Sequence, residues 1–169
     1  GLAVDDLSDR GLLRLGYAYQ QIGNWPESRR AFESLASYMP KSPWYYEARF
    51  GDARARENSN DYDNARIIYA DITAKTATII AAQAKLRIGY CNAIQKKYPE
   101  AVKAFLSVPY TYNYPECSAE ALYQAGAAQL TAKLPDQAAK SWTQLIKDYP
   151  KSKWASQGQK QLSLLPVKK

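Results

Sequence analysis

The chain has 169 residues, with 23 lysines and arginines, 16 aspartates and glutamates, and no histidine. The lack of histidine excludes catalytic triads, zinc clusters and general bases that use an imidazole, and leaves only carboxylate, lysine, tyrosine or thiol chemistry. At this length we expect one domain, and no apolar run is long enough to span a bilayer.

Four columns of residues repeat along the chain in steps of 37, 36 and 37 positions. The first column is a small residue, and twelve positions later a second small residue follows, then an aromatic and an aliphatic one. The last three are spaced i, i+4 and i+7, so they share one face of a helix. In chain order the columns hold Gly16, Ala53, Gly89 and Gly126; Ser28, Ala65, Ala101 and Ala138; Phe32, Tyr69, Phe105 and Trp142; Leu35, Ile72, Val108 and Leu145.

Each repeat is predicted to form two helices joined by a turn. The turns lie at residues 23–27, 58–63, 96–100 and 133–136, where glycine, asparagine, aspartate and proline gather. Proline is tolerated at the first helical position and Asp or Asn caps a helix start, so the second helix begins there. The hairpins are expected to start near Asp9, Tyr46, Ala82 and Ala119.

These columns resemble the tetratricopeptide repeat. The first repeat matches that family's small, aromatic and proline positions with Gly16, Ser28, Phe32 and Pro40, and the fourth with Gly126, Ala138, Trp142 and Pro150. The resemblance implies an all-α, right-handed solenoid of four helical hairpins in a single domain over residues 1–169. At one position that is usually alanine, the chain has larger residues: Leu35, Ile72, Val108 and Leu145.

The sequence around the first linker returns near the C-terminus. Residues 40–44 read Pro-Lys-Ser-Pro-Trp, and 110 positions later residues 150–154 read Pro-Lys-Ser-Lys-Trp. This echo predicts a ninth helix at about 154–165 that acts as a C-terminal cap. Ser42, Ser118 and Ser152 are expected to be N-caps of first helices. The Pro-x-Ser linkage resembles bacterial cell-envelope members of the family, which implies a periplasmic or envelope location.

No comparable cap is predicted at the other end. Leu2, Val4 and Leu7 give a short, partly apolar lead-in, and no targeting segment is visible in it. We therefore expect either further repeats in a larger array or self-association through the N-terminal face.

The resemblance implies a non-catalytic scaffold that binds a peptide or protein segment in a concave groove. Lysine and asparagine, which form the carboxylate clamp of chaperone-binding members, are missing from the corresponding positions, so a different ligand is expected. The position-5 residues Leu13, Phe50 and Leu86 fit a core role equally well. The predicted binding residues are Arg10, Leu13, Arg14, Tyr17, Phe50, Arg54, Leu86, Arg87, Tyr90 and Tyr123.

No pattern suggests an enzyme, a cofactor or a metal site. Cys91 and Cys117 are expected to be free, because their helices run parallel and hold them too far apart for a disulfide. The Asx-rich stretch 57–64 lacks the glycine and terminal glutamate of a calcium-binding loop and is predicted to be a turn.

The alternative function is an adaptor for an acidic surface or nucleic acid. Residues 133–169 hold eight lysines and two aspartates. A nucleic-acid site would favour arginine interleaved with aromatic residues, so the simpler interpretation of these lysines is a solvated face. Residues 108–115, with three tyrosines between prolines, form either a contact loop or a plug that packs on the fold.

Overall fold

The computed structural model describes residues 8–165, and over that range it contains nine α-helices and no strand. The helices gather into two compact units, divided between Thr76 and Ala77. The single domain expected over residues 1–169 stays a prediction. The predicted lead-in residues Leu2, Val4 and Leu7 lie outside the described residues.

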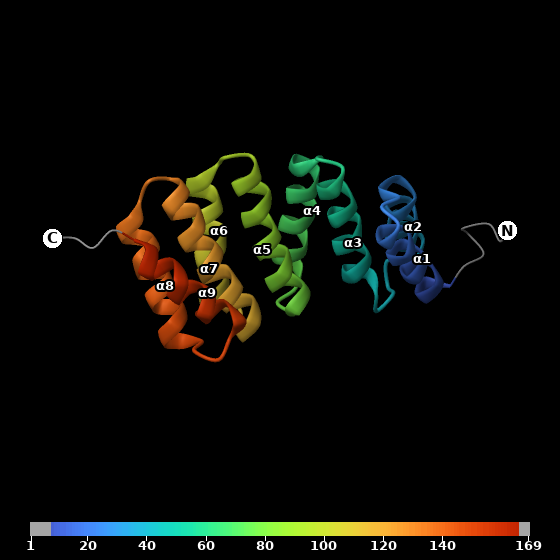
Figure 1. The fold of residues 1–169 in the computed structure, drawn as a ribbon. Helices are drawn as coiled ribbons and strands as arrows, with labels where there is room; N and C mark the ends of the chain where they lie inside the picture. The colour runs from blue at the N-terminus through green and yellow to red at the C-terminus, as the bar shows by residue number, and fades with distance from the viewer. Residues whose placement is uncertain (1–7, 166–169) are drawn as a thin grey trace. The chain divides into compact units, whose positions relative to one another are not determined.

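Unit 1 consists of two helical hairpins (Figure 1). Consecutive helices pack against each other, and the two first helices of the hairpins, α1 and α3, also pack side by side. The helices are α1 (Asp9–Gln21), α2 (Trp25–Tyr38), α3 (Tyr45–Asn58) and α4 (Tyr62–Lys75).

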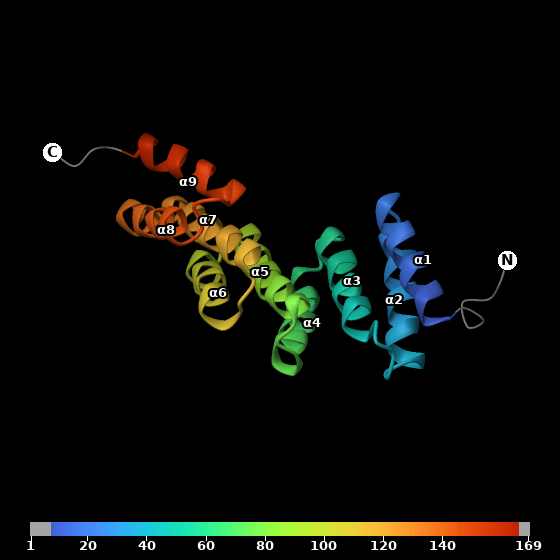
Figure 2. The ribbon, with the colours of Figure 1, turned by 90° about the horizontal axis from the view of Figure 1, so that it is seen from below.

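Unit 2 consists of two hairpins and a ninth helix. Its first helices, α5 and α7, pack side by side, and α9 packs on both α7 and α8 (Figure 2). The position of α9 confirms the C-terminal capping helix that the repeated linker predicts. The helices are α5 (Ile79–Ile94), α6 (Tyr98–Thr111), α7 (Pro115–Thr131), α8 (Pro135–Asp148) and α9 (Lys153–Leu164).

All four hairpin turns share one backbone conformation. The second residue after each first helix has a positive φ, between 61° and 71°, and the next backbone N–H bonds back to a carbonyl five residues earlier. This pattern is the Schellman motif, which ends a helix with one left-handed residue. The left-handed residues recur at the repeat spacing: Gly23, Asn60, Lys96 and Lys133.

The small and aromatic columns pack into each other. The ring of Phe32 fills the space that a Cβ would need on both Gly16 and Gly51, since that atom would lie 2.5 Å from the ring. The ring of Phe105 packs against Gly89 in the same way, and the ring of Trp142 packs against Gly126. The small residues therefore recur because an aromatic ring from the second helix reaches the first helix's backbone.

One of the three serines predicted as N-caps has that role. Ser152 caps α9, and its Oγ accepts a hydrogen bond from the N–H of Ala155 at 3.1 Å. Ser118 lies inside α7 and is buried, because Pro115 suits the first turn and starts the helix earlier. Ser42 lies before α3, whose N-cap is Trp44.

The two cysteines do not form a disulfide, as predicted, and both are buried. Burial raises the pKa of the Cys117 thiol, with the negative charges of Glu120 and Glu116 adding to the effect. None of the helices between residues 8 and 165 is long and apolar enough to cross a membrane.

Candidate binding surfaces on the first helices

The residues predicted to bind a partner all lie on first helices of the hairpins. In unit 1 they form what we call the unit 1 surface: Arg10, Leu13, Arg14 and Tyr17 on α1, with Phe50 and Arg54 on α3. In unit 2 they form the unit 2 surface: Leu86, Arg87 and Tyr90 on α5, with Tyr123 on α7.

Two of these ten residues belong to the core. Leu13 is 8% exposed and packs in a cluster with Phe32 and Leu35, while Leu86 is 5% exposed. Phe50 is half-buried, and its ring centroid lies 5.4 Å from that of Tyr69. Of the two roles open to the position-5 leucines, the structure therefore supports the core role.

Tyr17 is the more exposed of the two aromatic residues of the unit 1 surface. Its side chain is 39% exposed, and its ring stands edge-on to the buried Phe32, with centroids 5.2 Å apart and planes at 76°. Burial of part of the ring raises the pKa of the Tyr17 hydroxyl, and the charge of Glu47 on α3 raises it further. Part of the Tyr17 side chain is therefore accessible to a ligand.

Three arginines accompany Tyr17 along α1 and α3. Arg10 and Arg14 are exposed. Arg54 is half-buried, and its Nε is buried with no hydrogen-bond partner among the residues that the structure describes. Buried polar groups normally have a partner. Because that Nε is buried, a partner segment could reach Arg54 only through the accessible part of its side chain.

Tyr90 is the equivalent of Tyr17 on the unit 2 surface. Its ring stands edge-on to Phe105 at 5.4 Å and 84°, and the Arg87 guanidinium lies 4.6 Å from the ring centroid. Its hydroxyl donates a 2.6 Å hydrogen bond to Oε1 of Glu120 on α7. Burial, followed by the hydrogen bond and charge of Glu120, raises the pKa of Tyr90.

Tyr123 is partly covered by the capping helix. Its ring centroid lies 5.1 Å from that of Trp154 on α9, and Lys153 lies 5.1 Å from the centroid of Trp154 on the same helix. The indole N–H of Trp142 donates to the Tyr123 carbonyl at 3.1 Å. The role of Trp154 at this surface was missed, although the repeated linker marks it as the counterpart of Trp44.

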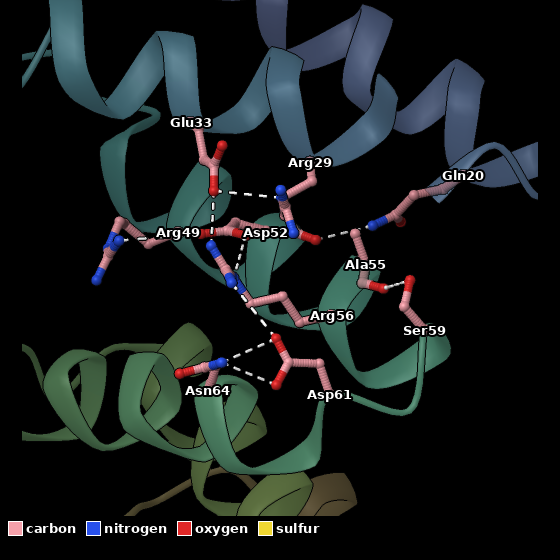
Figure 3. A network of polar contacts seen from close by, with 11 residues as sticks. Gln20, Arg29, Glu33, Arg49, Asp52, Ala55, Arg56, Ser59, Asp61 and Asn64 are labelled. Atoms are coloured by element: carbon pink, nitrogen blue, oxygen red, sulfur yellow. Dashed lines mark hydrogen bonds and ion pairs between the residues drawn. The ribbon is translucent and has the colours of Figure 1, made fainter. Parts of the chain in front are cut away.

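The strongest charge cluster is a structural network in unit 1 (Figure 3). The Arg56 guanidinium contacts Glu33 at 2.6 Å, Asp52 at 2.8 Å and Asp61 at 3.5 Å. Asp52 is 2% exposed, and burial raises the pKa of its carboxyl despite the lowering effect of Arg56. The network joins α2, α3 and the start of α4, and sequence analysis did not single it out.

No arrangement in the described part of the chain resembles a metal centre. Between residues 8 and 165 there is no group of three or more cysteines, aspartates and glutamates that could hold an ion. Asn60 and Asp61, within the stretch examined for calcium ligands, form the α3–α4 turn.

The tyrosine-rich stretch has both a buried and an exposed part. Tyr112 is 8% exposed and packs on the fold, as the plug interpretation requires, and burial raises its pKa. Tyr110 is 78% exposed and belongs to the last turn of α6, because the helix continues through Pro109 to Thr111. The linker itself is therefore shorter than predicted.

Comparisons with known proteins agree with the repeat columns. Two family models match the sequence, both described as tetratricopeptide repeat, over residues 13–78 and 120–152. No curated protein matches the sequence.

Solved structures of repeat proteins match the fold. The TPR-like repeats of a Podosopora anserina protein of kinesin light chain type superimpose with a TM-score of 0.71 at 14% identity, covering 91% of this chain and 82% of that one. A tetratricopeptide repeat protein from Parabacteroides merdae gives 0.71 at 16% identity, with 92% and 59% covered. MamA from Desulfovibrio magneticus gives 0.69 at 14%, with 85% and 76% covered. At these identities the likeness establishes the fold alone: an all-α helical repeat of the solenoid class.

Proposed function

The chain belongs to the tetratricopeptide repeat family, and from that premise we propose that it is a non-catalytic scaffold that binds a peptide or protein segment through its first-helix surfaces. Repeats of this family are generally protein–protein interaction scaffolds. The proposal requires that the unit 1 surface and the unit 2 surface each contact the partner.

The observation that carries the proposal is the matched pair of Tyr17 and Tyr90. Each lies on a first helix, each stands edge-on to a buried phenylalanine, and each keeps part of its ring accessible. Tyrosine and arginine are enriched at the energetic centres of interfaces, because they combine a large contact area with hydrogen-bonding groups. Rings fixed before binding lose little conformational entropy when a partner docks.

The test uses the double variant Tyr17→Ala/Tyr90→Ala. Ligands are first selected on the wild type from randomised peptides displayed on phage, and their affinity for the variant is then measured. We expect its affinity for selected peptides to fall by about 10-fold or more, the effect of an interface anchor residue, while the helical circular dichroism signal persists. The matched control is Tyr38→Ala/Tyr110→Ala, since these tyrosines are 67% and 78% exposed and lie on second helices. Equal affinity of the double variant and the wild type would refute the proposal.

A second candidate function rests on the lysines of residues 133–169. The described members are all exposed, so a positive surface is available to an acidic partner or to nucleic acid. This function predicts binding that weakens steeply with salt and is lost when Lys147, Lys151 and Lys153 are changed to glutamine. The exposed lysines are Lys133, Lys140, Lys147, Lys151, Lys153 and Lys160.

Location in a bacterial periplasm or envelope stays a prediction from the linker resemblance. Membership of a larger array, or self-association through the N-terminal face, is likewise a proposal. Sedimentation of the chain at several concentrations tests self-association, and a single monomer species throughout would count against it.

A further inference from the structure

We propose that a hollow beside Tyr90, at the edge of the unit 2 surface, is a pocket for one leucine- or isoleucine-type side chain of the bound segment. This inference rests on the proposed scaffold function and specifies the chemistry of its ligand. The hollow lies between α5, α6 and α7 and has a volume of about 330 Å³. Its lining consists of Tyr90, Ala93, Ile94, Tyr98, Phe105, Gln124, Ala127, Ala128 and Thr131.

The hollow has a cause in the sequence. Tyr17, Arg54 and Tyr90 are equivalent residues on successive first helices, spaced by 37 and 36 positions, and the fourth member of the column is Ala127. Three large side chains are thus followed by a methyl group at the place where the next large side chain is expected. The missing side chain leaves space beside Tyr90, and a partner can fill it.

The walls of the hollow are fixed before any ligand arrives. Tyr90 is held by its hydrogen bond to Glu120, by Arg87 over its ring and by Phe105 at its edge. Phe105 is 1% exposed, and Ala128 is 6% exposed. Because these side chains are packed, the hollow cannot close by a simple change of rotamer.

The lining selects an uncharged aliphatic occupant. No lysine, arginine, aspartate or glutamate lines the hollow. The nearby Glu120 carboxylate already accepts the Tyr90 hydroxyl hydrogen. Ile94 contributes an apolar side chain that is 52% exposed. A charged side chain would lose its hydration here without gaining an opposite charge, whereas an aliphatic one would be buried against aromatic and methyl groups.

The experiment measures the coupling between Ala127 and the partner's aliphatic residue. Twelve-residue random peptides are selected on the intact chain, and each selected peptide is compared with versions in which one Leu, Ile, Val or Met is changed to Ala. On the wild type we expect one such change to weaken binding about 10- to 100-fold, the effect of burying one aliphatic side chain. On Ala127→Tyr, both peptide versions should bind equally weakly, because the introduced ring fills the hollow.

Two further variants serve as an independent test and as a control. Ile94→Asp places a charge at the hollow without filling it and should produce the same loss, which keeps the test valid if Ala127→Tyr does not fold. Ala70→Tyr, at an exposed position of α4 in unit 1, is the control for an added ring and should bind like the wild type.

The outcomes separate this inference from the proposed function. If Tyr17→Ala weakens binding but Ala127→Tyr and Ile94→Asp do not, the scaffold function stands and the pocket is refuted. If no selected peptide responds to Tyr17→Ala, Tyr90→Ala or the hollow variants, both are refuted. If the chain instead dimerises and Ala127→Tyr abolishes the dimer, the hollow is filled by a second copy, and the inference of a foreign partner is wrong.

Discussion

Tyr90 on α5 and Glu120 on α7 are joined by a 2.6 Å hydrogen bond between the tyrosine hydroxyl and the carboxylate. The bond links two neighbouring first helices at the unit 2 surface. Its strength depends on the tyrosine keeping its proton, since a phenolate and a carboxylate would repel each other.

This bond predicts a specific loss of stability in alkali. The native pKa of Tyr90 is raised above its ordinary value of 10 by burial and by Glu120. In the unfolded chain it ionises first, so its contribution to stability is complete below pH 10 and declines as the pH rises toward the native pKa. We expect the urea midpoint of the wild type to fall more between pH 9 and pH 11 than that of Tyr90→Phe. Tyr38→Phe, at an exposed site, should follow the wild type, and parallel curves for all three would contradict the assignment.

The close contacts between glycines and aromatic rings predict that two Gly→Ala substitutions in unit 2 differ clearly in their effect on stability. Gly89→Ala would push a Cβ into the ring of Phe105, and overpacking of this kind costs about 1–3 kcal/mol. In Gly158→Ala the nearest atom would be a terminal methyl of Leu145 at 3.0 Å, which can move aside. That variant should be close to neutral, because alanine also favours the helix. Urea denaturation measures both, and equal effects would show that the ring does not fix the helix spacing.

From the Arg56 network we predict that removing Arg56 alone lowers the unfolding free energy more than removing Arg56 and Asp52 together. Arg56→Met removes the 2.8 Å contact of the buried Asp52 and leaves only Arg49 at 4.0 Å, so we expect a loss of about 2–4 kcal/mol in unfolding free energy. The double variant Asp52→Leu/Arg56→Met should recover most of it. In the single variant, stability should also improve as the pH falls and Asp52 takes up a proton. A loss below about 0.5 kcal/mol, typical of an exposed ion pair, would mean that the network is not stabilising.

The left-handed turn residues predict a stabilising substitution. Lys133 has a φ of 63°, a conformation that is unfavourable for a side chain bearing a Cβ and free for glycine. Lys133→Gly should therefore raise the unfolding free energy by about 0.5–1 kcal/mol. The reciprocal change, Gly23→Ala, should lower it by a similar amount, since Gly23 has a φ of 71° and open space around it. Thermal unfolding of both variants gives the comparison, and shifts of the same sign would contradict the argument.

The buried cysteines predict slow thiol chemistry. Cys117 is 8% exposed and its pKa is raised, so at pH 8 little of it is thiolate. Reaction with a disulfide reagent should be much slower in the native chain than in 6 M guanidinium chloride, for both cysteines. Rapid labelling of either one without denaturant would show that unit 2 opens locally.

The spacing of the repeat columns predicted the helices well, because the same packing contact recurs in the repeats and requires that spacing. The glycine and aromatic columns reflect a ring pressed onto a backbone, and this contact needs only the right residues at fixed spacing. The repeated linker predicted α9, since the sequence before Trp154 copies the one before Trp44. Its bounds, Lys153–Leu164, lie within one residue of the prediction.

The side-chain environments were harder to predict. Position 5 lies at the edge between groove and core, and only the packing decides that Leu13 and Leu86 are buried. Ser118 is a good capping residue, but Pro115 starts the helix before it. The Arg56 network joins residues from three helices, and its partners Glu33, Asp52 and Asp61 follow no repeat spacing. Ala127 was visible as a small residue in a large-residue column, whereas the hollow beside it requires the positions of α5 and α6.

The ring of Phe32 packs against the backbone at both Gly16 and Gly51, which belong to successive hairpins. One ring therefore joins two repeats. In a linear array, the free energy divides into a contribution from each repeat and a contribution from each boundary between neighbours. Phe32 contributes to the first boundary, so Phe32→Leu should broaden the unfolding transition of unit 1 as well as lower its midpoint. Phe32 thus couples the folding of the two hairpins, together with the ion pair between Glu33 and Arg56.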